Sequence, residues 1–274
     1  MAGSFCAHCG QRAIPAYPTL RELASDSFHE VSGWDGRFVS TFKTLIRKPG
    51  ELTREFLIGH RARYISPIRL YLVTSLLYFL VAAAAPNVER NATAVDLGGG
   101  VRVGVFTPRQ EGAAPALTPE EQKELRASID SVPRVFRPVI ERAAEDPEGF
   151  RRSMMTTLPR ALFVLVPVFA GIMALFYRGR HYPEHLYFAF HLHAFIFLAL
   201  TVSAVAKLSL LAPVVMIAQL GALIAIGIYA TKATRHVYGG SLVRTLAKGI
   251  AVAFLYSIAA VPAFTVLLVW AALI

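Results

Sequence analysis

Five long apolar runs constrain this chain more than any other feature of its sequence. They cover about residues 67–85, 158–177, 185–206, 208–230 and 249–274. A helix rises about 1.5 Å per residue, so roughly 20 apolar residues cross the ~30 Å hydrocarbon core of a bilayer. A single soluble domain of this length would not need several such runs. The sequence therefore predicts an all-α integral membrane protein with about five transmembrane helices.

The composition agrees with this prediction. Hydrophobic residues make up 55% of the 274 residues and charged residues 17%, whereas an average soluble domain is roughly 25% charged. Residues 1–66 contain no uninterrupted apolar core of the kind that a cleavable signal peptide has. We therefore expect the first span to act as its own insertion signal.

The spans divide the chain into five segments. Residues 1–12 hold a CxxC motif, residues 13–66 form a cytoplasmic amphipathic helical segment, and residues 67–86 form the first span. Residues 87–157 are expected to be an external loop with helices that make a small cap, and residues 158–274 hold the other four spans.

Within the external segment, the pattern of residues 101–106 suggests a short hairpin. Thr118-Pro119-Glu120-Glu121 has the form of a helix start, with proline at the first helical position and a glutamate placed for a capping box. Helices are expected to about residue 131 and again over about 134–155.

The distribution of lysine and arginine predicts the orientation. Residues 1–66 carry nine basic against six acidic residues, whereas residues 87–157 carry ten against eleven. The short connections after spans two and four add Arg178, Arg180, Lys232, Arg235, Arg244 and Lys248, with Glu184 as the acid among them. Cytoplasmic loops are the basic ones, so we expect a multi-pass protein of a bacterial inner membrane with a cytoplasmic N-terminus and an external C-terminus. The net charge of +10 then reflects topology, and no nucleic acid partner is expected.

The segment before the first span has two interpretations. Leu52, Phe56 and Leu57 alternate with charged residues after a break at Pro49-Gly50. This pattern is typical of a helix in the headgroup region with its basic side toward anionic lipid, and equally of a helix packed on the cytoplasmic face of the bundle.

Aromatic and basic residues near the first and fourth spans are candidate contacts for anionic headgroups. An interfacial anchor is the simpler interpretation, because arginine and tyrosine commonly flank spans. The alternative is a binding site for an anionic ligand. The candidates are Arg61, Arg63, Tyr64, Arg69, Arg235 and His236.

The only two cysteines are Cys6 and Cys9, in the sequence FCAHCGQ. A CxxC turn followed by glycine resembles half of a zinc knuckle, and a closed structural zinc site needs four ligands. Three interpretations stay open: a degenerate half knuckle, zinc shared between chains or with His29, and no metal. A disulfide framework is not possible with one pair of this spacing.

The start of the third span gathers ionisable residues. Glu184, His185, His191 and His193 lie in the sequence YPEHLYFAFHLHAF. Ionisable side chains inside a membrane are costly and face protein or a water-filled cavity, which makes them functional candidates. At 100° per residue the four do not form a single stripe. They predict either a polar intramembrane site or histidines that bond to neighbouring spans.

Several segments together resemble the bacterial membrane proteins grouped as domain of unknown function 3667. They are FCAHCGQR, LIRKPGELTREFLIGHRARYISPIRLYLVTSLLYFL, YPEHLYFAFHLHAF and RHVYGGS. The resemblance implies that Arg61, Tyr64, Pro67 and the four residues of the third span belong to the family pattern. It also implies two knuckles near the N-terminus, of which this chain matches the second. The family has no established activity, so no role follows.

Three functional hypotheses follow. The first is a non-enzymatic transport, lipid-handling or assembly component with a polar His/Glu site in the bundle, and it leans against an enzyme. The second is a membrane-embedded enzyme with metal or acid–base chemistry at the same histidines. The third is a scaffold that binds a partner through its N-terminal segment. The lipid bilayer, anionic headgroups and a homo-oligomer are the expected partners, and zinc at Cys6 and Cys9 is the expected cofactor.

Overall fold

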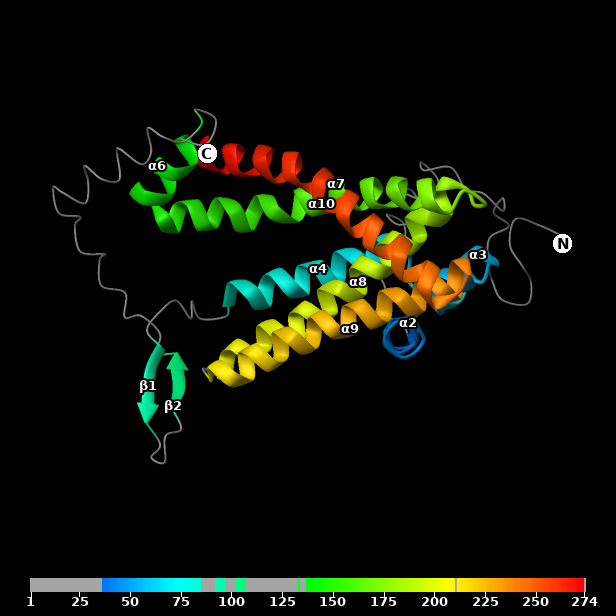
Figure 1. Ribbon diagram of the computed structural model, residues 1–274, viewed down its shortest axis with the longest axis horizontal. Helices are drawn as coiled ribbons and strands as arrows, with labels where there is room; N and C mark the ends of the chain where they lie inside the picture. The colour runs from blue at the N-terminus through cyan, green and yellow to red at the C-terminus, as the bar shows by residue number, and fades with distance from the viewer. Residues whose placement is uncertain are drawn as a thin grey trace.

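The computed structural model describes residues 36–84, 92–96, 102–106, 133, 137–209 and 211–273. Nearly all of these residues are helical (Figure 1). The elements are α2 (Gly36–Arg47), α3 (Glu51–Leu57), η1 (Arg61–Arg63), α4 (Pro67–Ala84), β1 (Ala92–Asp96), β2 (Arg102–Phe106), α6 (Arg137–Glu145), α7 (Pro147–Phe176), α8 (Tyr182–Ala206), η2 (Lys207–Ser209), α9 (Ala212–Tyr238) and α10 (Leu242–Leu273).

Five of these helices, α4 and α7 to α10, are long and apolar enough to cross a membrane. The prediction of five such helices is confirmed. Helix α8 is the most enclosed of them, with 56% of its most apolar window buried, against 17% for α9 and 11% for α10. It packs against α4, α7 and α9, while α10 crosses α7 and α9. Helix α8 is therefore the centre of the bundle, and α9 and α10 present wide apolar faces outward.

The ends of α9 and α10 differ from the sequence prediction. The fourth span was predicted to end near residue 230 and the fifth to begin near 249, but α9 continues to Tyr238 and α10 already begins at Leu242. Hydropathy marks where the apolar residues end, whereas the backbone hydrogen-bond ladder continues through charged residues. Helix α9 ends where Gly239 and Gly240 adopt φ angles of 74° and 99°, a conformation that glycine accepts at low cost.

The boundary before the second span also differs. A helix over about 134–155 was expected to precede a span that begins near 158. The chain instead breaks at Asp146, whose side chain accepts a hydrogen bond from the Gly149 backbone N–H at 2.8 Å. Pro147 occupies the first turn of α7, a position that suits proline. Helix α7 then runs without interruption to Phe176.

Part of the 87–157 segment forms a two-stranded antiparallel hairpin. Strand β1 pairs with β2, with Ala92 opposite Phe106 and Asp96 opposite Arg102. Strand β2 covers the residues where a short hairpin was expected, and it departs from a purely helical architecture. The expected helix start at Thr118 lies outside the described residues.

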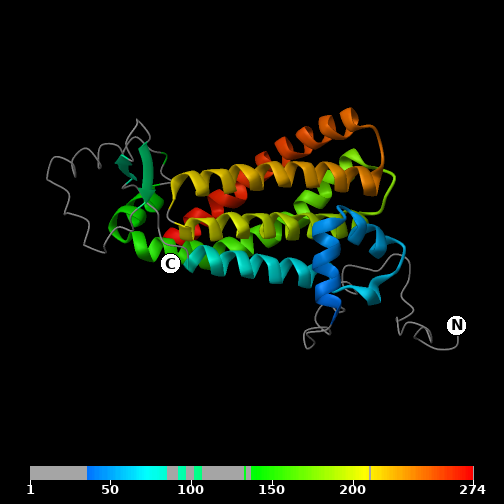
Figure 2. The same cartoon turned by 90° about the horizontal axis from the view of Figure 1, so that it is seen from below.

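The helix ends sort into two groups. Helices α2 and α3, the α7–α8 connection and the α9–α10 turn lie at one end of the bundle, as Figures 1 and 2 show from two directions. The hairpin, α6, η2 and the C-terminal end of α10 lie at the other end. We call the first group the basic end, because its described residues hold Glu51, Glu55 and Glu184 against a clear majority of lysine and arginine: Arg37, Lys43, Arg47, Lys48, Arg54, Arg61, Arg63, Arg69, Arg178, Arg180, Lys232, Arg235, Arg244 and Lys248.

Helix α3 is seated directly on the bundle. Its side chains Leu52, Thr53 and Phe56 are buried, and the helix contacts α8 and α9. The seat begins at Gly50, whose φ angle is +84°. A Cβ atom there would lie 2.8 Å from the Ala233 carbonyl oxygen and 3.1 Å from the Cα of the same residue. The close approach of α3 to α9 therefore requires glycine.

We expect Gly50→Ala to destabilise the protein more than Gly59→Ala. Both glycines flank α3 with positive φ, so both substitutions carry left-handed strain of about 1–2 kcal/mol. Only position 50 adds a clash with backbone, which costs roughly 1–3 kcal/mol more, since a Cβ at Gly59 meets nothing within 4 Å. SDS titration in mixed micelles measures the free energy of unfolding. Equal losses in the two variants would contradict the seating of α3 through Gly50.

Candidate functional site

His191 ties the centre of the bundle to the N-terminal segment. The residue is on α8, with 3% of its surface exposed. Its Nδ1 atom shares a hydrogen bond of 2.9 Å with the Thr53 hydroxyl of α3. The Phe56 ring contacts the imidazole edge-on, with centroids 5.4 Å apart. The Nε2 atom is buried and has no hydrogen-bond partner among the described residues.

His185 lies six residues before His191 on α8, nearly two helical turns nearer the basic end, and has a different partner. Its Nδ1 atom shares a hydrogen bond of 2.9 Å with the Tyr238 hydroxyl at the end of α9. The two rings are stacked, with an interplanar angle of 11°. The ring is fully buried, so this pair fixes the end of α9 against the start of α8.

His193 has both ring nitrogens engaged. A carbonyl oxygen only accepts, so Nδ1–H donates to the Ala189 carbonyl of the preceding turn at 2.8 Å. In the neutral ring Nε2 is then an acceptor, and it lies 3.2 Å from the Tyr256 hydroxyl of α10. The Phe169 ring of α7 packs edge-on against the His193 ring and against the Tyr256 ring. His193 thus joins α8 to α10.

Glu184 belongs to the start of α8 rather than to the interior. One carboxylate oxygen accepts from the His181 backbone N–H at 3.1 Å, which completes a capping box. The other oxygen lies 2.8 Å from Arg180 Nη1. Arg180 in turn donates from Nη2 to the Val237 carbonyl at 2.6 Å. These linked contacts supply a hydrogen bond to the Val237 carbonyl at the C-terminal end of α9, where carbonyl groups have no partner within their own helix.

The four predicted residues of the third span therefore have separate partners. His191 reaches α3, His185 reaches α9 and His193 reaches α10, while Glu184 caps its own helix. Among the described residues, no group of three or more His, Cys, Asp or Glu side chains is placed to hold a metal ion. The arrangement joins helices at three points.

The predicted headgroup contacts divide into inward and outward residues. Arg61 donates from Nε to the Phe56 carbonyl at 3.3 Å and lies over the Tyr187 ring. Arg69 lies over the Phe38 ring at 4.8 Å, and Tyr64 is buried.

The other three headgroup candidates lie further from the bundle interior. His236 Nε2 lies 2.7 Å from the Glu51 carboxylate of α3. Arg63 and Arg235 are both exposed. Arg63 and Arg235 are therefore the two candidates most available to an external ligand.

Sequence reasoning missed an aromatic cluster between the turns of the basic end. The Tyr177 and Tyr238 rings lie 4.4 Å apart, centroid to centroid. Lys248 Nζ donates to the Phe176 carbonyl at 2.7 Å and lies 4.4 Å from the Tyr177 centroid. Burial raises the pKa of the Tyr177 phenol, so the phenol stays neutral beneath the ammonium group. These residues come from three separate helix ends, and no spacing in the sequence connects them.

Cys6, Cys9 and His29 lie outside the described residues. The zinc interpretations of the CxxC motif stay predictions.

Comparison with known proteins gives one match. The family model described as protein of unknown function (DUF3667) matches residues 35–79, which supports the resemblance seen in the sequence. No curated protein and no solved structure matches the chain significantly. The matched segment covers α2, α3, η1 and most of α4, and thus includes Gly50 and Thr53 at the contact with α8 and α9.

We expect Thr53→Val and His191→Ala to be energetically coupled. Either substitution alone removes the 2.9 Å hydrogen bond, and leaving a buried polar group without a partner costs about 1–3 kcal/mol. The double variant should lose about 1 kcal/mol less than the sum of the single losses. SDS titration of all four proteins gives the coupling energy.

Thr74→Val is the matched control for this cycle. Thr74 is also fully buried, but its hydroxyl donates to the Leu70 carbonyl of its own helix at 2.9 Å. Its loss should add to that of His191→Ala without coupling. Additive losses for Thr53 and His191 as well would show that the contact does not hold α3 in place.

Proposed function

We propose that this chain is a non-enzymatic, multi-pass component of a bacterial inner membrane that handles lipid at the cytoplasmic leaflet. The observation that carries the proposal is the gathering of the basic turns and the N-terminal helices at one end of the bundle (Figures 1 and 2). Lysine and arginine are enriched in cytoplasmic connections. In the proposed orientation the basic end faces the cytoplasm and the C-terminal end of α10 faces outward.

Helix α2 supports a position at the membrane surface. Its buried side chains Thr41 and Leu45 face the protein. The opposite face exposes Val39 and Ile46, with Lys43 between them at helical spacing. Exposed apolar residues beside a lysine suit the boundary between headgroups and acyl chains, where the amine reaches phosphate. The two sequence interpretations concerned the segment of α3, which packs on the bundle; the proposal assigns the position in the headgroup region to α2 instead.

In this proposal the histidines of α8 hold neighbouring helices in position and do not take part in chemistry. The Thr53–His191 contact and the Glu51–His236 contact hold α3 on α8 and α9. Headgroup contacts at α2 are thereby joined to the bundle through a short, buried helix. A membrane-embedded enzyme would instead need these histidines to share one cavity with a substrate.

A scaffold is the second candidate, and a specific observation favours it. Ile58, directly after α3, is a large apolar residue that is 55% exposed. A protein partner could cover this surface, together with a zinc-bound CxxC segment at Cys6 and Cys9. The two candidates differ in whether lipid or protein contacts the basic end.

The orientation is testable by labelling single cysteines in cells. With Cys6 and Cys9 replaced by serine, Ser209→Cys lies in η2 and Ser241→Cys lies in the α9–α10 turn; both positions are exposed. We expect a membrane-impermeant maleimide to label position 209 in intact spheroplasts and position 241 only after permeabilisation. A reporter fused after Ile274 should be active outside. The reverse labelling pattern would overturn the proposed orientation.

Lipid handling is testable by removing the gene from the source bacterium. We expect a changed content or leaflet distribution of anionic phospholipid, measured by lipid mass spectrometry and by amine- or phosphate-reactive probes on intact cells. Wild-type protein should restore the distribution, and Gly50→Ala protein, with α3 displaced, should restore it poorly. Unchanged lipids together with loss of a co-purifying protein complex would favour the scaffold instead.

A further inference from the structure

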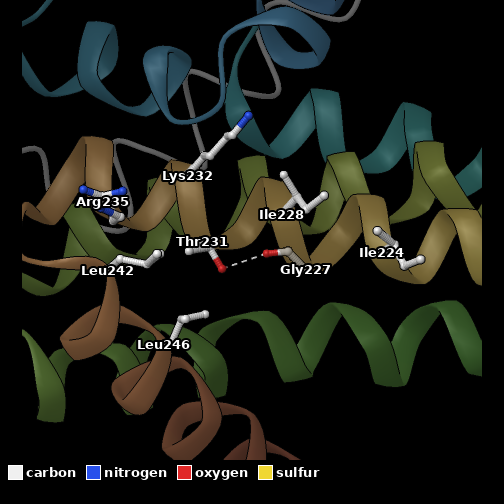
Figure 3. A pocket seen from close by; sticks show the side chains of 8 residues that line it. All are labelled: Ile224, Gly227, Ile228, Thr231, Lys232, Arg235, Leu242 and Leu246. Atoms are coloured by element: carbon white, nitrogen blue, oxygen red, sulfur yellow. Dashed lines mark hydrogen bonds between the residues drawn. The ribbon is translucent and has the colours of Figure 1, made fainter.

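A groove opens between α9 and α10 near the basic end. It has a volume of about 600 Å³, within the range of roughly 300–1,000 Å³ of small-molecule sites. Ile224 and Ile228 line it from α9, and Leu242 and Leu246 line it from α10 (Figure 3). We call it the α9–α10 groove.

The floor of the groove is apolar because its polar atoms are satisfied within α9. Gly227 lines the groove without a side chain. The Thr231 hydroxyl donates to the Gly227 carbonyl at 2.8 Å (Figure 3). This bond turns the hydroxyl back to its own helix. This part of the groove therefore offers no free hydroxyl to a polar ligand, and its apolar surface suits an acyl chain.

Two cations lie at the end of the groove nearest the turn. Lys232 and Arg235 both line it and both are exposed. Within the part of the chain that the structure describes, neither side chain forms an ion pair, whereas the nearby His236 is already paired with Glu51. In Figure 3 the Lys232 side chain extends from α9 away from Leu246. The groove thus combines an apolar floor with an unneutralised positive end.

We propose that the α9–α10 groove binds one anionic phospholipid of the surrounding leaflet. Lys232 and Arg235 hold its phosphate, and one acyl chain lies along Ile228 toward Ile224. The α9 residues that line the groove run from 224 to 235, a rise of roughly 16 Å at 1.5 Å per residue. This length spans from the headgroup level toward the middle of the ~30 Å hydrocarbon layer.

The depth of Lys232 gives the argument for a lipid rather than a free anion. It lies six residues before the end of α9, about 9 Å along the helix axis. A lysine at this depth on a lipid-facing helix extends its amine to the interface, where lipid phosphate is the available counter-charge. Inorganic phosphate would use the two cations but would leave the apolar part of the groove without a ligand.

The inference deepens the proposed function and rests on it for the placement of the basic end at the headgroup level. The two can fail separately. Cysteine labelling tests the orientation in cells, whereas lipid binding is measured on purified protein and does not depend on which leaflet the site faces.

The test is retention of lipid by the full chain, purified in mild detergent and titrated with phosphatidylglycerol or phosphatidylcholine in native mass spectrometry. We expect phosphatidylglycerol to bind with a stoichiometry of one in preference to phosphatidylcholine. Inorganic phosphate at equal concentration should not displace it. Equal binding of the two lipids, or displacement by phosphate, would overturn the proposal.

Charge variants test the positive end. We expect K232Q together with R235Q to weaken phosphatidylglycerol binding by about tenfold to thirtyfold, as the loss of two charges near a membrane surface implies. Arg244→Gln is the matched control, because Arg244 is exposed at the same end but does not line the groove. A similar loss in the control would assign the effect to net charge and overturn a local site.

A filling variant tests the apolar part. A Cβ at Gly227 meets nothing within 4 Å, and the same is true of Gly221, which does not line the groove. We therefore expect Gly227→Leu to fold, to fill the groove and to weaken phosphatidylglycerol binding at least tenfold. Gly221→Leu should bind as the wild type does. Unchanged affinity of a folded Gly227→Leu protein would overturn the proposed path of the acyl chain.

Discussion

The enclosure of α8 by its neighbours is the constraint on which the rest of the structure depends. A helix buried in the centre of a bundle cannot place imidazole groups in lipid or in bulk water, so each must find a partner on an adjacent element. His185, His191 and His193 leave α8 in different directions and reach Tyr238, Thr53 and Tyr256. One central helix therefore fixes the position of three neighbours, and two of these contacts lie toward the basic end.

The segments that carry the family resemblance are far apart in the chain but meet in space. The segment after Pro49 supplies Gly50 and Thr53, the start of α8 supplies His191, and the end of α9 supplies His236. A short helix such as α3, with seven residues, is too short to be stable alone. Its position follows from the close approach at Gly50 and from the two side-chain contacts. The family model covers only residues 35–79, yet the surfaces against which this segment packs lie more than a hundred residues later.

Periodicity and hydropathy predicted the five spans because the length of an apolar helix is set by the bilayer and needs no knowledge of packing. They misplaced the ends of α9 and α10 because helices continue through charged residues such as Lys232 until a residue like Gly239 ends them. The histidines were found because ionisable groups in a span are rare, but their partners depend on which helices are adjacent, and sequence spacing does not contain that information. The cluster of Tyr177, Tyr238 and Lys248 had no signal in the sequence for the same reason.

The inner and outer faces of α9 have opposite characters, and this division gives the molecule its organisation. On the inner face Tyr229 and Ala233 are buried, and Ala233 lies so close to Gly50 that the helices are fixed in register. Lys232 and Arg235 lie about 100° and 200° around the helix from Ala233, and both are exposed without an acidic partner among the described residues. Changes on the inner face should therefore act through stability, and changes on the outer face through what the membrane supplies. The proposed lipid on the outer face would contact the same helix that holds α3 on the inner face.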